Sequence, residues 1–403
     1  MPEASNKTLH VLGGGAWQVP TILLAKRLGY RVFVTDMYEN PPGYAFADDH
    51  AVVNVRDREG TLAAARSRAI DGIICDTTDV GVPTAAYVAE TLGLPGIGLD
   101  VAMRFTDKYL MREATSARGI LGPRYVFVTD PSDLARAESI GFPSIVKPAD
   151  SQSSRGVRRV DSRADLPAAL EYALANSAAG RALVEEFIDG TEVTVEGMCR
   201  DGVVHVLGIS DKGHYADNPQ VASHLAYPPG MSDDVIERIR AANAQVVGAL
   251  GLRTGVTHAE FIVTAEGRIY LVEIAARGGG SRVYTHIAPY LSGVPIPELY
   301  VRYCMGDDVA WPIPVPGRRA ALLEFFEIPV GVVRSIEGVE AAAKLPGVAD
   351  LALELTVGQR FGGADNDRAR PGYVVAFGET RDEVRAIAAR ARATIRVEVE
   401  PET

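Results

Sequence analysis

The chain has 403 residues, of which 47% are apolar and 23% are charged, a composition typical of globular proteins with roughly two to four domains. Its 52 acidic and 41 basic residues give a formal net charge of −11, which argues against nucleic acid as a partner. No apolar run approaches the ~18 residues of a spanning helix, and residues 1–8 do not resemble a signal peptide, so we expect a cytoplasmic protein without a membrane partner.

Residues 1–105 alternate short apolar runs, rich in branched side chains, with segments of helix length. Gly93 follows the last apolar position of one such segment, where a C-cap glycine belongs. This alternation predicts a doubly wound sheet of parallel strands. The expected strands are 8–13, 31–35, 51–55 and 72–76, and the expected helices are 17–28, 62–69 and 84–92.

The rest of the chain predicts three further units. Residues 106–180 form a smaller mixed unit, with strands at 125–128 and 144–147 and a helix at 166–175. Residues 181–310 are dominated by consecutive strands interrupted by one long helix from Ser232 to Gly251, a pattern typical of an antiparallel α+β domain. The proline-rich stretch 311–317 predicts a boundary, after which 318–403 would form a C-terminal α+β unit.

A glycine cluster, Gly13–Gly15, lies between the first predicted strand and helix, and Asp36 closes the next strand. This imitates the fingerprint of nicotinamide dinucleotide binding. The third glycine position of that fingerprint holds Gln18, which is too bulky for close packing of helix and strand. A tight turn whose amides bind a carboxylate or phosphate is the alternative.

Residues 257–275 predict two strands joined by a hairpin. A two-residue loop at Glu266 and Gly267 would place Glu260 directly opposite Glu273, with Cβ atoms about 4.5–5.5 Å apart, where like charges repel. A divalent cation would offset this repulsion, because Mg²⁺ binds one or two carboxylates together with water and phosphate. The alternative is that one glutamate faces solvent or pairs with Arg268 or Arg277.

Cations and polar loops surround this hairpin in the sequence. Arg277 and the turn Gly278–Gly280 follow Glu273, and a guanidinium suits recognition of phosphoryl or carboxylate oxygens. Lys147 closes a strand before the polar loop 151–157, which offers amides and hydroxyls to phosphates. Each element also has a simpler interpretation as a solvated surface group or flexible loop.

Taken in chain order, these elements resemble the ATP-grasp superfamily of ligases over about residues 1–300. The residues that carry the resemblance are Lys108, Lys147, the loop 151–157, Glu185-Glu186-Phe187-Ile188, Glu192, Glu260, Glu273 and Arg277. Residues 318–403 resemble the C-terminal domain of L-amino-acid ligases, the dipeptide-forming branch. The fold implied is a doubly wound N-terminal domain (1–105), an ATP-grasp fold with a small (106–180) and a large (181–310) subdomain, and a C-terminal α+β domain (318–403).

The resemblance implies ATP and Mg²⁺ as cofactors and assigns a role to each matching residue. Lys108 and Lys147 would bind the nucleotide phosphates, under a loop containing Ser153, Ser154 and Gly156. Glu185 and the backbone of Glu186, Phe187 and Ile188 would hold the adenine, and Glu192 the ribose. Glu260 and Glu273 would hold magnesium. Arg277, with Lys147 and Ser281, would act at the acyl phosphate. Gly278 and Gly279 would contact the substrates, as would His214 and His224, which lie in a predicted loop at residues 212–229.

Two departures refine this expectation. Ala275 stands where many members have asparagine, which removes an oxygen ligand but is shared by amino-acid ligases that read Glu-x-x-x-Arg. The phosphate loop is poor in glycine, with Gly156 alone. Members of this superfamily commonly form homodimers, and nothing in the sequence fixes the oligomeric state.

The predicted reaction joins a carboxylate to an amine through an acyl phosphate, with release of ADP and phosphate, on small-molecule substrates such as amino acids. Three alternatives stay open at this point. An ATP-grasp ligase or phosphotransferase with another acceptor, such as a thiol or bicarbonate, would share every nucleotide residue. An NAD-dependent oxidoreductase would use Gly13–Gly15 and Asp36. A non-catalytic nucleotide-binding module would keep the lysines without needing the carboxylate pair.

Overall fold

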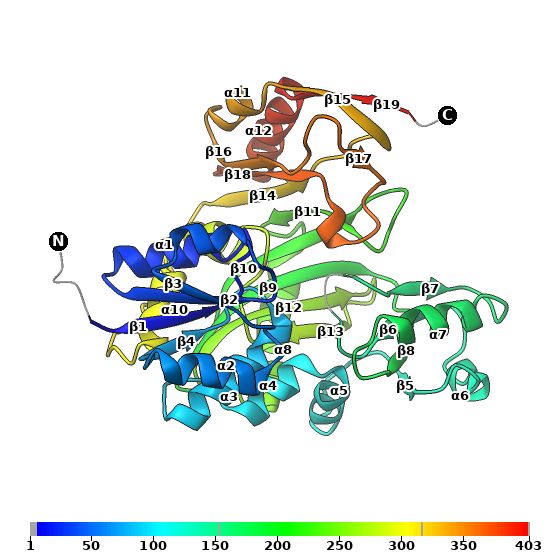
Figure 1. Cartoon of the computed structure of the whole chain (residues 1–403). Helices are drawn as coiled ribbons and strands as arrows, with labels where there is room; N and C mark the ends of the chain where they lie inside the picture. The colour runs from blue at the N-terminus through cyan, green and yellow to red at the C-terminus, as the bar shows by residue number, and fades with distance from the viewer. Residues whose placement is uncertain (1–5, 152–153, 316, 402–403) are drawn as a thin grey trace.

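The computed structural model describes residues 6–151, 154–315 and 317–401. Its N-terminal part is a parallel sheet in the order β3-β2-β1-β4 with helices on its faces (Figure 1), which confirms the predicted doubly wound pattern. Its elements are β1 (Thr8–Leu12), α1 (Val19–Arg27), β2 (Arg31–Asp36), β3 (Asp49–Val52), α2 (Arg58–Ser67), β4 (Gly72–Ile74), α3 (Val82–Leu92), α4 (Leu99–Thr106) and α5 (Lys108–Ser116), with short 3-10 turns at Pro42–Phe46 and Asp79–Gly81.

Next along the chain comes a small antiparallel sheet in the order β5-β8-β6-β7. Helix α7 covers it because its apolar residues Leu166, Ala169, Leu170 and Ala173 recur at helical spacing and are all buried. The elements are β5 (Tyr125–Val128), α6 (Leu134–Glu138), β6 (Ser144–Pro148), β7 (Arg158–Val160), α7 (Leu166–Ala175) and β8 (Ala182–Glu186).

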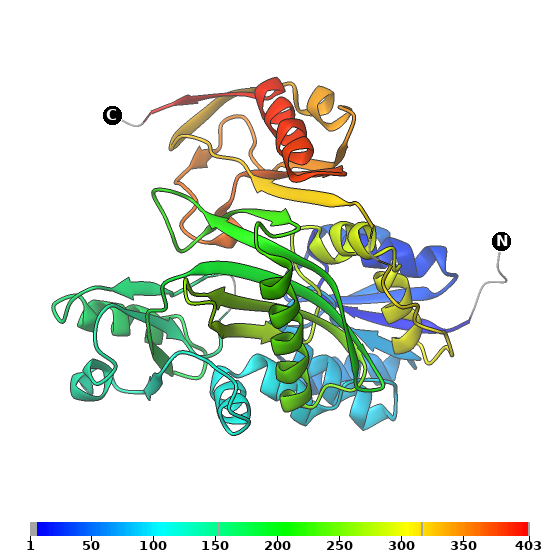
Figure 2. The same cartoon turned by 180° about the vertical axis from the view of Figure 1, so that it is seen from behind.

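The central sheet has eight strands in the order β13-β12-β9-β10-β11-β14-β18-β16, all paired antiparallel. Helix α8 packs on one face (Figure 2) and ends, as predicted, at Gly251, whose φ of 85° is left-handed. The elements are β9 (Thr191–Arg200), β10 (Val203–His214), β11 (Ala222–Tyr227), α8 (Asp233–Leu250), β12 (Gly255–Val263), β13 (Ile269–Ala275), β14 (Ala320–Phe325), β16 (Val348–Leu353) and β18 (Gly372–Gly378).

The central sheet contains strands from both sides of the proline-rich boundary predicted at 311–317. Strand β11, before that stretch, pairs with β14, which follows it. The C-terminal part therefore shares a sheet with the part before it and adds a small sheet, β17-β15-β19, at the top of Figure 1. The remaining elements are a π-helical turn (Val283–Ile287), α9 (Ala288–Ser292), α10 (Ile296–Cys304), β15 (Gly331–Glu337), α11 (Val339–Ala343), β17 (Arg360–Phe361), a 3-10 turn (Asp367–Ala369), α12 (Arg381–Thr394) and β19 (Arg396–Glu400).

One predicted loop is a strand. Residues 212–229 contain the end of β10 and the whole of β11, which alternates residues between two apolar clusters. That alternation is short and interrupted by polar residues, so the sequence pattern predicted a loop. No helix in the described part of the chain is long and apolar enough to cross a membrane.

Candidate active site

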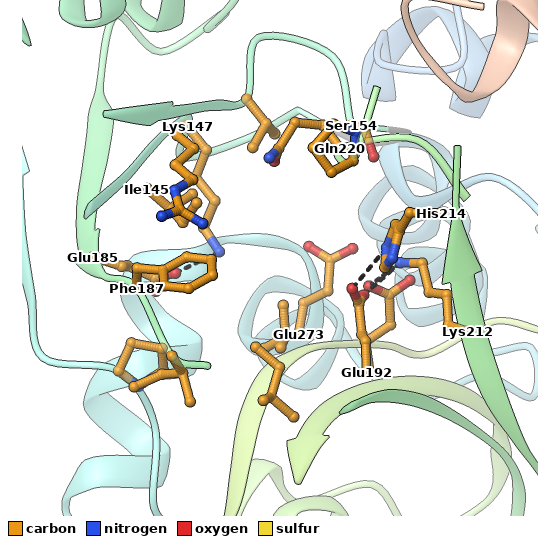
Figure 3. Close-up of a pocket in the computed structure, with 18 of the residues that line it drawn as sticks. Ile145, Lys147, Ser154, Glu185, Phe187, Glu192, Lys212, His214, Gln220 and Glu273 are labelled. Atoms are coloured by element: carbon orange, nitrogen blue, oxygen red, sulfur yellow. Dashed lines mark hydrogen bonds and ion pairs between the residues drawn. The ribbon is translucent and has the colours of Figure 1, made fainter. Parts of the chain in front are cut away.

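A cavity of about 410 Å³ lies where the small sheet meets the central sheet (Figure 3). Strands from both sheets supply its walls, so residues far apart in the sequence face a common space. The predicted residues that it brings together are Lys108, Lys147, Ser154, Glu185, Glu186, Phe187, Ile188, Glu192, His214, Glu260 and Glu273. These residues therefore share one cavity, and their binding of a nucleotide stays a prediction.

At one end of the cavity, Glu185 forms a buried cluster with two cations. Its carboxylate accepts hydrogen bonds from Arg112 Nε at 2.9 Å and Lys147 Nζ at 2.6 Å. Burial alone would raise the pKa of Glu185, but Arg112 and Lys147 lower it below the usual value. The same burial lowers the pKa of Lys147, and Glu185 opposes that change. The cluster leaves one net positive charge at this end of the cavity.

The backbone after Glu185 offers one open donor for an adenine ring. The amide of Glu186 donates to Arg124 O at 3.0 Å, and that of Phe187 donates to Pro143 O at 3.1 Å. Within the described residues, the amide of Ile188 has no protein acceptor. The Phe187 ring stacks against the Arg159 guanidinium, 4.1 Å from the ring centroid, and both line the cavity. Of the three predicted backbone contacts to adenine, only the amide of Ile188 is therefore open as a donor, and its contact with adenine stays a prediction.

Near the predicted phosphate end, Lys108 is buried and bridges two segments. Its Nζ donates to Ser151 O at 3.0 Å and lies 3.2 Å from Glu273 Oε2. Ser154 and Gly156 form a tight turn with positive φ values of 57° and 82°. A side chain at Gly156 would meet Pro148 and Asn176, so only glycine fits there. The predicted phosphate ligand Ser153 lies outside the described residues.

The carboxylates of Glu260 and Glu273 stand directly opposite each other across β12 and β13. This confirms the predicted pairing, but by a different route. The hairpin closes through Thr264 and Arg268 around a three-residue loop, which displaces the register near the turn by one residue. A bulge between Glu260 and Phe261 in the pairing, with Val272 as the extra residue of β13, restores the alignment.

A lysine from another element neutralises each carboxylate: Lys212 comes from β10 and Lys108 from the start of α5. Lys212 Nζ lies 3.0 Å from Glu260 Oε2, and Lys108 Nζ lies 3.2 Å from Glu273 Oε2. Burial opposes ionisation of Glu260, but Lys212 and His258 hold its pKa well below the usual range. Burial likewise lowers the pKa of His258, while Glu196, 2.6 Å from Nδ1, and Glu260 raise it to about 9. Two carboxylates, each with a lysine beside it, therefore face the cavity.

The donor set fits magnesium bound together with a nucleotide. Among the described residues, no group of three or more His, Cys, Asp or Glu side chains is placed to hold a metal alone. Mg²⁺ does not need such a cage, because it keeps waters and binds through one or two carboxylates plus substrate phosphates. Ala275 supplies no side-chain oxygen, so Glu260 and Glu273 would be the protein ligands.

Arg277 does not line the nucleotide cavity. It follows β13, and its guanidinium binds both carboxylate oxygens of Asp79, with Nε 2.6 Å from Oδ1 and Nη2 3.0 Å from Oδ2. Burial alone would raise the pKa of Asp79, but Arg277 lowers it. Asp79 lies in the N-terminal part, so the predicted catalytic arginine is oriented by a different part of the chain.

The glycine turn after Arg277 has three open amides. The N–H groups of Gly278 and Gly279 donate to Asp76 O at 2.9 Å and Glu196 Oε2 at 3.3 Å. In the described structure, the amides of Gly280, Ser281 and Arg282 have no protein acceptor. Consecutive amides in such a turn favour an anion. The amides of Gly278 and Gly279 therefore already have protein acceptors, whereas the next three amides, which include that of Ser281, are open; a substrate contact at this turn stays a prediction.

The two predicted substrate histidines lie on paired strands, because His224 pairs with Gly213, the residue before His214. His214 lines the nucleotide cavity, where Nε2 is 3.0 Å from Glu192 Oε2, beside Lys212 (Figure 3). His224 shares the face of β11 that packs toward α12, because Ala226, two residues on, belongs to that apolar cluster. Burial and the charge of Arg385 on α12 lower the pKa of His224. Of the two histidines, His214 alone lines the cavity.

In the structure, the backbone amide that nicotinamide dinucleotide binding would need already has an acceptor. Gly14 N donates to Asp36 Oδ2 at 2.7 Å, and Tyr38 N donates to Oδ1 at 3.0 Å. The carboxylate that would bind a ribose thus occupies the amide that would bind a phosphate. Gln18 also lies over the turn, with its side chain bonded to Thr77 at 2.6 Å.

Four functional residues escaped the sequence analysis: Asp79, Arg112, Lys212 and His258. Each acts through a partner far away in the chain, and none belongs to a motif of fixed spacing. The one available signal was at His258, which shares a strand face with Glu260 at the two-residue spacing of a β-strand.

Comparison with known proteins agrees with this geometry. The ATP-grasp domain family matches residues 140–285, and the family "L-amino acid ligase C-terminal domain 2" matches residues 324–400. A formate-dependent phosphoribosylglycinamide formyltransferase from Paraburkholderia xenovorans is 28% identical over 98% of this chain and 96% of its own. A relative of the same description from Rhodococcus jostii is 28% identical over 77% of this chain and 78% of its own.

Solved structures share the fold over nearly the whole chain. An L-amino acid ligase from Bacillus licheniformis superposes with a TM-score of 0.83 at 22% identity, covering 98% of this chain and 99% of that one. The biotin carboxylase domain of a Hydrogenobacter thermophilus 2-oxoglutarate carboxylase, solved with magnesium ADP and bicarbonate, gives 0.77 at 16% identity over 98% and 91%. The chain therefore contains an ATP-grasp domain over residues 140–285 and an L-amino acid ligase C-terminal domain over residues 324–400, and it is an ADP-forming ligase that uses ATP and Mg²⁺.

Proposed function

We propose that this chain joins the carboxylate of one amino acid to the amine of another through an acyl phosphate, with release of ADP and phosphate. The observation that carries the proposal is the placement of two anion sites along one stretch of chain. Glu273 faces the nucleotide cavity, and Arg277 with the open amides of 280–282 begins a second site immediately after it. A carboxylate held at the second site would meet the terminal phosphate of ATP at the first.

In the first step, a carboxylate oxygen attacks the γ-phosphorus, the bond to the β-phosphate oxygen breaks, and ADP leaves. In the second step, the amine attacks the acyl carbon, and phosphate departs with the oxygen that the carboxylate contributed. Lys108 and Lys147 would neutralise phosphate charge from fixed, buried positions. Magnesium bound by Glu260 and Glu273 would supply further positive charge. Arg277 would stabilise the negative charge that develops at the acyl carbon.

The choice of amino acids as substrates rests on the C-terminal domain. That domain matches the L-amino acid ligase family and shares the central sheet with the nucleotide site. A second candidate follows from the relatives matched over most of their length, which are described as formate-dependent phosphoribosylglycinamide formyltransferases. In that case formate would be the carboxylate, and the amine would belong to a phosphoribosyl compound.

The test is ADP and phosphate release with a panel of substrates. Purified protein with ATP and Mg²⁺ is given single amino acids, pairs of amino acids, or formate with phosphoribosylglycinamide. We expect ADP release with selected amino acid pairs and a peptide-bonded product by mass spectrometry. Release with formate and phosphoribosylglycinamide alone would favour the second candidate. Release of AMP and pyrophosphate would contradict both.

A further inference from the structure

We propose that the C-terminal domain positions the substrate-facing turn through Arg282, which acts as a positioning residue held by Asp350 and Tyr373. The inference rests on the proposed function in one respect, namely that the open amides of residues 280–282 face the substrate carboxylate. It goes beyond it by assigning a role in that site to the C-terminal domain, which contributes no side chain to the nucleotide cavity among the described residues.

The turn holds a backbone conformation that its residues do not favour. Ser281 and Arg282 have φ values of 50° and 70°, in the left-handed region that side chains with a Cβ rarely adopt. The π-helical turn Val283–Ile287 follows directly, another uncommon geometry that is frequent at functional sites. Such conformations persist only where surrounding contacts enforce them.

Those contacts come from the C-terminal domain. Arg282 Nε lies 2.5 Å from Asp350 Oδ2 on β16 and 3.1 Å from the hydroxyl oxygen of Tyr373 on β18. The Tyr373 hydroxyl donates to the same carboxylate oxygen at 2.9 Å. The pair is mostly shielded from solvent, because the side chains of Arg282 and Asp350 are 19% and 26% exposed. One arginine is therefore fixed by two residues from adjacent strands.

The N-terminal part completes the enclosure. The Arg282 guanidinium lies 5.5 Å from the centroid of the Trp17 ring, and Trp17 in turn contacts Tyr373 with centroids 5.5 Å apart. Val283 and Ile287 of the π-helical turn pack into the same apolar cluster as Tyr373. Side chains from the N-terminal part and the C-terminal domain therefore both contact Arg282, one of the two residues with a left-handed φ.

The consequence is that loss of the Arg282–Asp350 pair should disturb the substrate turn without disturbing the nucleotide cavity. Arg282 is not in that cavity, and the residues that bind it lie on strands at the far end of the central sheet from β12 and β13. A small displacement of an oriented binding group is costly to turnover. We expect KM for the carboxylate substrate to rise roughly tenfold to a hundredfold in R282M and D350N, with KM for ATP unchanged.

The variants R282M, D350N and R282K are compared with R334M as control. Arg334 forms an ion pair with Glu400 in the same domain, away from the turn. R282K should recover part of the loss in R282M, because lysine keeps the charge toward Asp350, whereas R334M should match the wild type. The double variant R282M/D350N should lose no more than the worse single variant, since both remove one pair. Equal increases in KM for ATP and for the carboxylate would overturn the proposal.

Amide hydrogen exchange provides a readout that does not depend on the substrate. We expect the peptide covering residues 278–287 to exchange faster in R282M and D350N than in the wild type, and R334M to leave it unchanged. If no amino acid pair supports turnover of the wild type, the proposed function fails while the exchange still decides the positioning role. Unchanged exchange at 278–287 in both R282M and D350N would overturn the inference.

Discussion

Arg277 and Asp79 form a two-point ion pair that joins the end of β13 to the N-terminal part, with both guanidinium–carboxylate contacts between 2.6 and 3.0 Å. The fork geometry fixes the orientation of the guanidinium as well as its charge. The side chains are only 14% and 18% exposed, so water does little to loosen the pair. Asp79 therefore sets the orientation of the Arg277 guanidinium.

Two substitutions separate the charge of Arg277 from its orientation. We expect R277M to lower kcat by roughly a hundredfold or more, because it removes fixed positive charge from the developing oxyanion. R277K keeps the charge but not the fork and should recover only part of the loss. D79N should lower kcat less than R277M and leave ATP binding unchanged. Steady-state kinetics with D100N, at an exposed aspartate of α4, provides the control; a D79N variant with wild-type kcat would contradict the assignment.

The carboxylate pair on β12 and β13 predicts a specific metal dependence. We expect E273Q to reduce ADP release by roughly a hundredfold and to raise the Mg²⁺ concentration needed for half-maximal rate, because one of two protein ligands is lost. Chelation should abolish turnover of the wild type, and added Mg²⁺ should restore it. E266Q, at the exposed tip of the same hairpin, is the matched control. Unchanged Mg²⁺ dependence in E273Q would remove the metal assignment.

Arg112 links the adenine end of the cavity to the bulge in β13. Its Nη2 donates a hydrogen bond to Val272 O at 2.6 Å, and its Nε donates one to Glu185. Arg112 is 2% exposed. We expect R112M to lower the free energy of unfolding by about 3–5 kcal/mol, because it removes one of the two cations that bind the buried Glu185 carboxylate and takes the side-chain donor from the Val272 carbonyl. R124M, at an exposed arginine paired with Glu186, should cost less than about 1 kcal/mol. Equal losses in urea titrations of the two variants would contradict this role.

Asp76 predicts a pH dependence of stability. Burial raises the pKa of Asp76 from 3.8 to about 6, although hydrogen bonds from Thr21 and Thr77 act in the opposite direction. The folded chain therefore binds this proton more tightly than the unfolded chain. The stabilisation is complete below about pH 4 and is lost as the pH rises through 6.

The expected comparison is between the wild type and D76N. Relative to D76N, the wild type should lose on the order of 3 kcal/mol of unfolding free energy between pH 4 and pH 7, since about two pKa units are involved. Chemical denaturation at several pH values measures the difference and cancels the other titrating groups. A difference that stays constant with pH would mean that Asp76 titrates normally.

Much of the fold follows from local patterns in the sequence. The parallel N-terminal strands appear as branched apolar runs, and Gly93 and Gly251 both end helices in the left-handed conformation. Most residues that line the cavity could be picked out from the sequence because they lie on strands or in loops between them, and Lys108 lies at the start of a helix. Strand β11 was missed because its alternation is short, and its pairing with β14 depends on residues about a hundred positions away.

The site also depends on geometry that no local pattern encodes. Glu260 meets Glu273 only because a bulge at Val272 compensates for a hairpin loop one residue longer than predicted. Lys212 reaches Glu260 from β10, and Asp79 reaches Arg277 from the N-terminal part. Such contacts are set by the packing of distant elements on one another, so local sequence patterns indicate neither Lys212 nor Asp79 as part of the site.

Oxygen transfer tests the central claim most directly. With a carboxylate substrate labelled with ¹⁸O in both oxygens, an acyl phosphate pathway requires one labelled oxygen to leave with inorganic phosphate in each turnover. We predict that mass spectrometry will find singly labelled phosphate in amounts equal to the ADP released, and no label in ADP. Unlabelled phosphate, or label in AMP, would contradict activation of the carboxylate by the γ-phosphate.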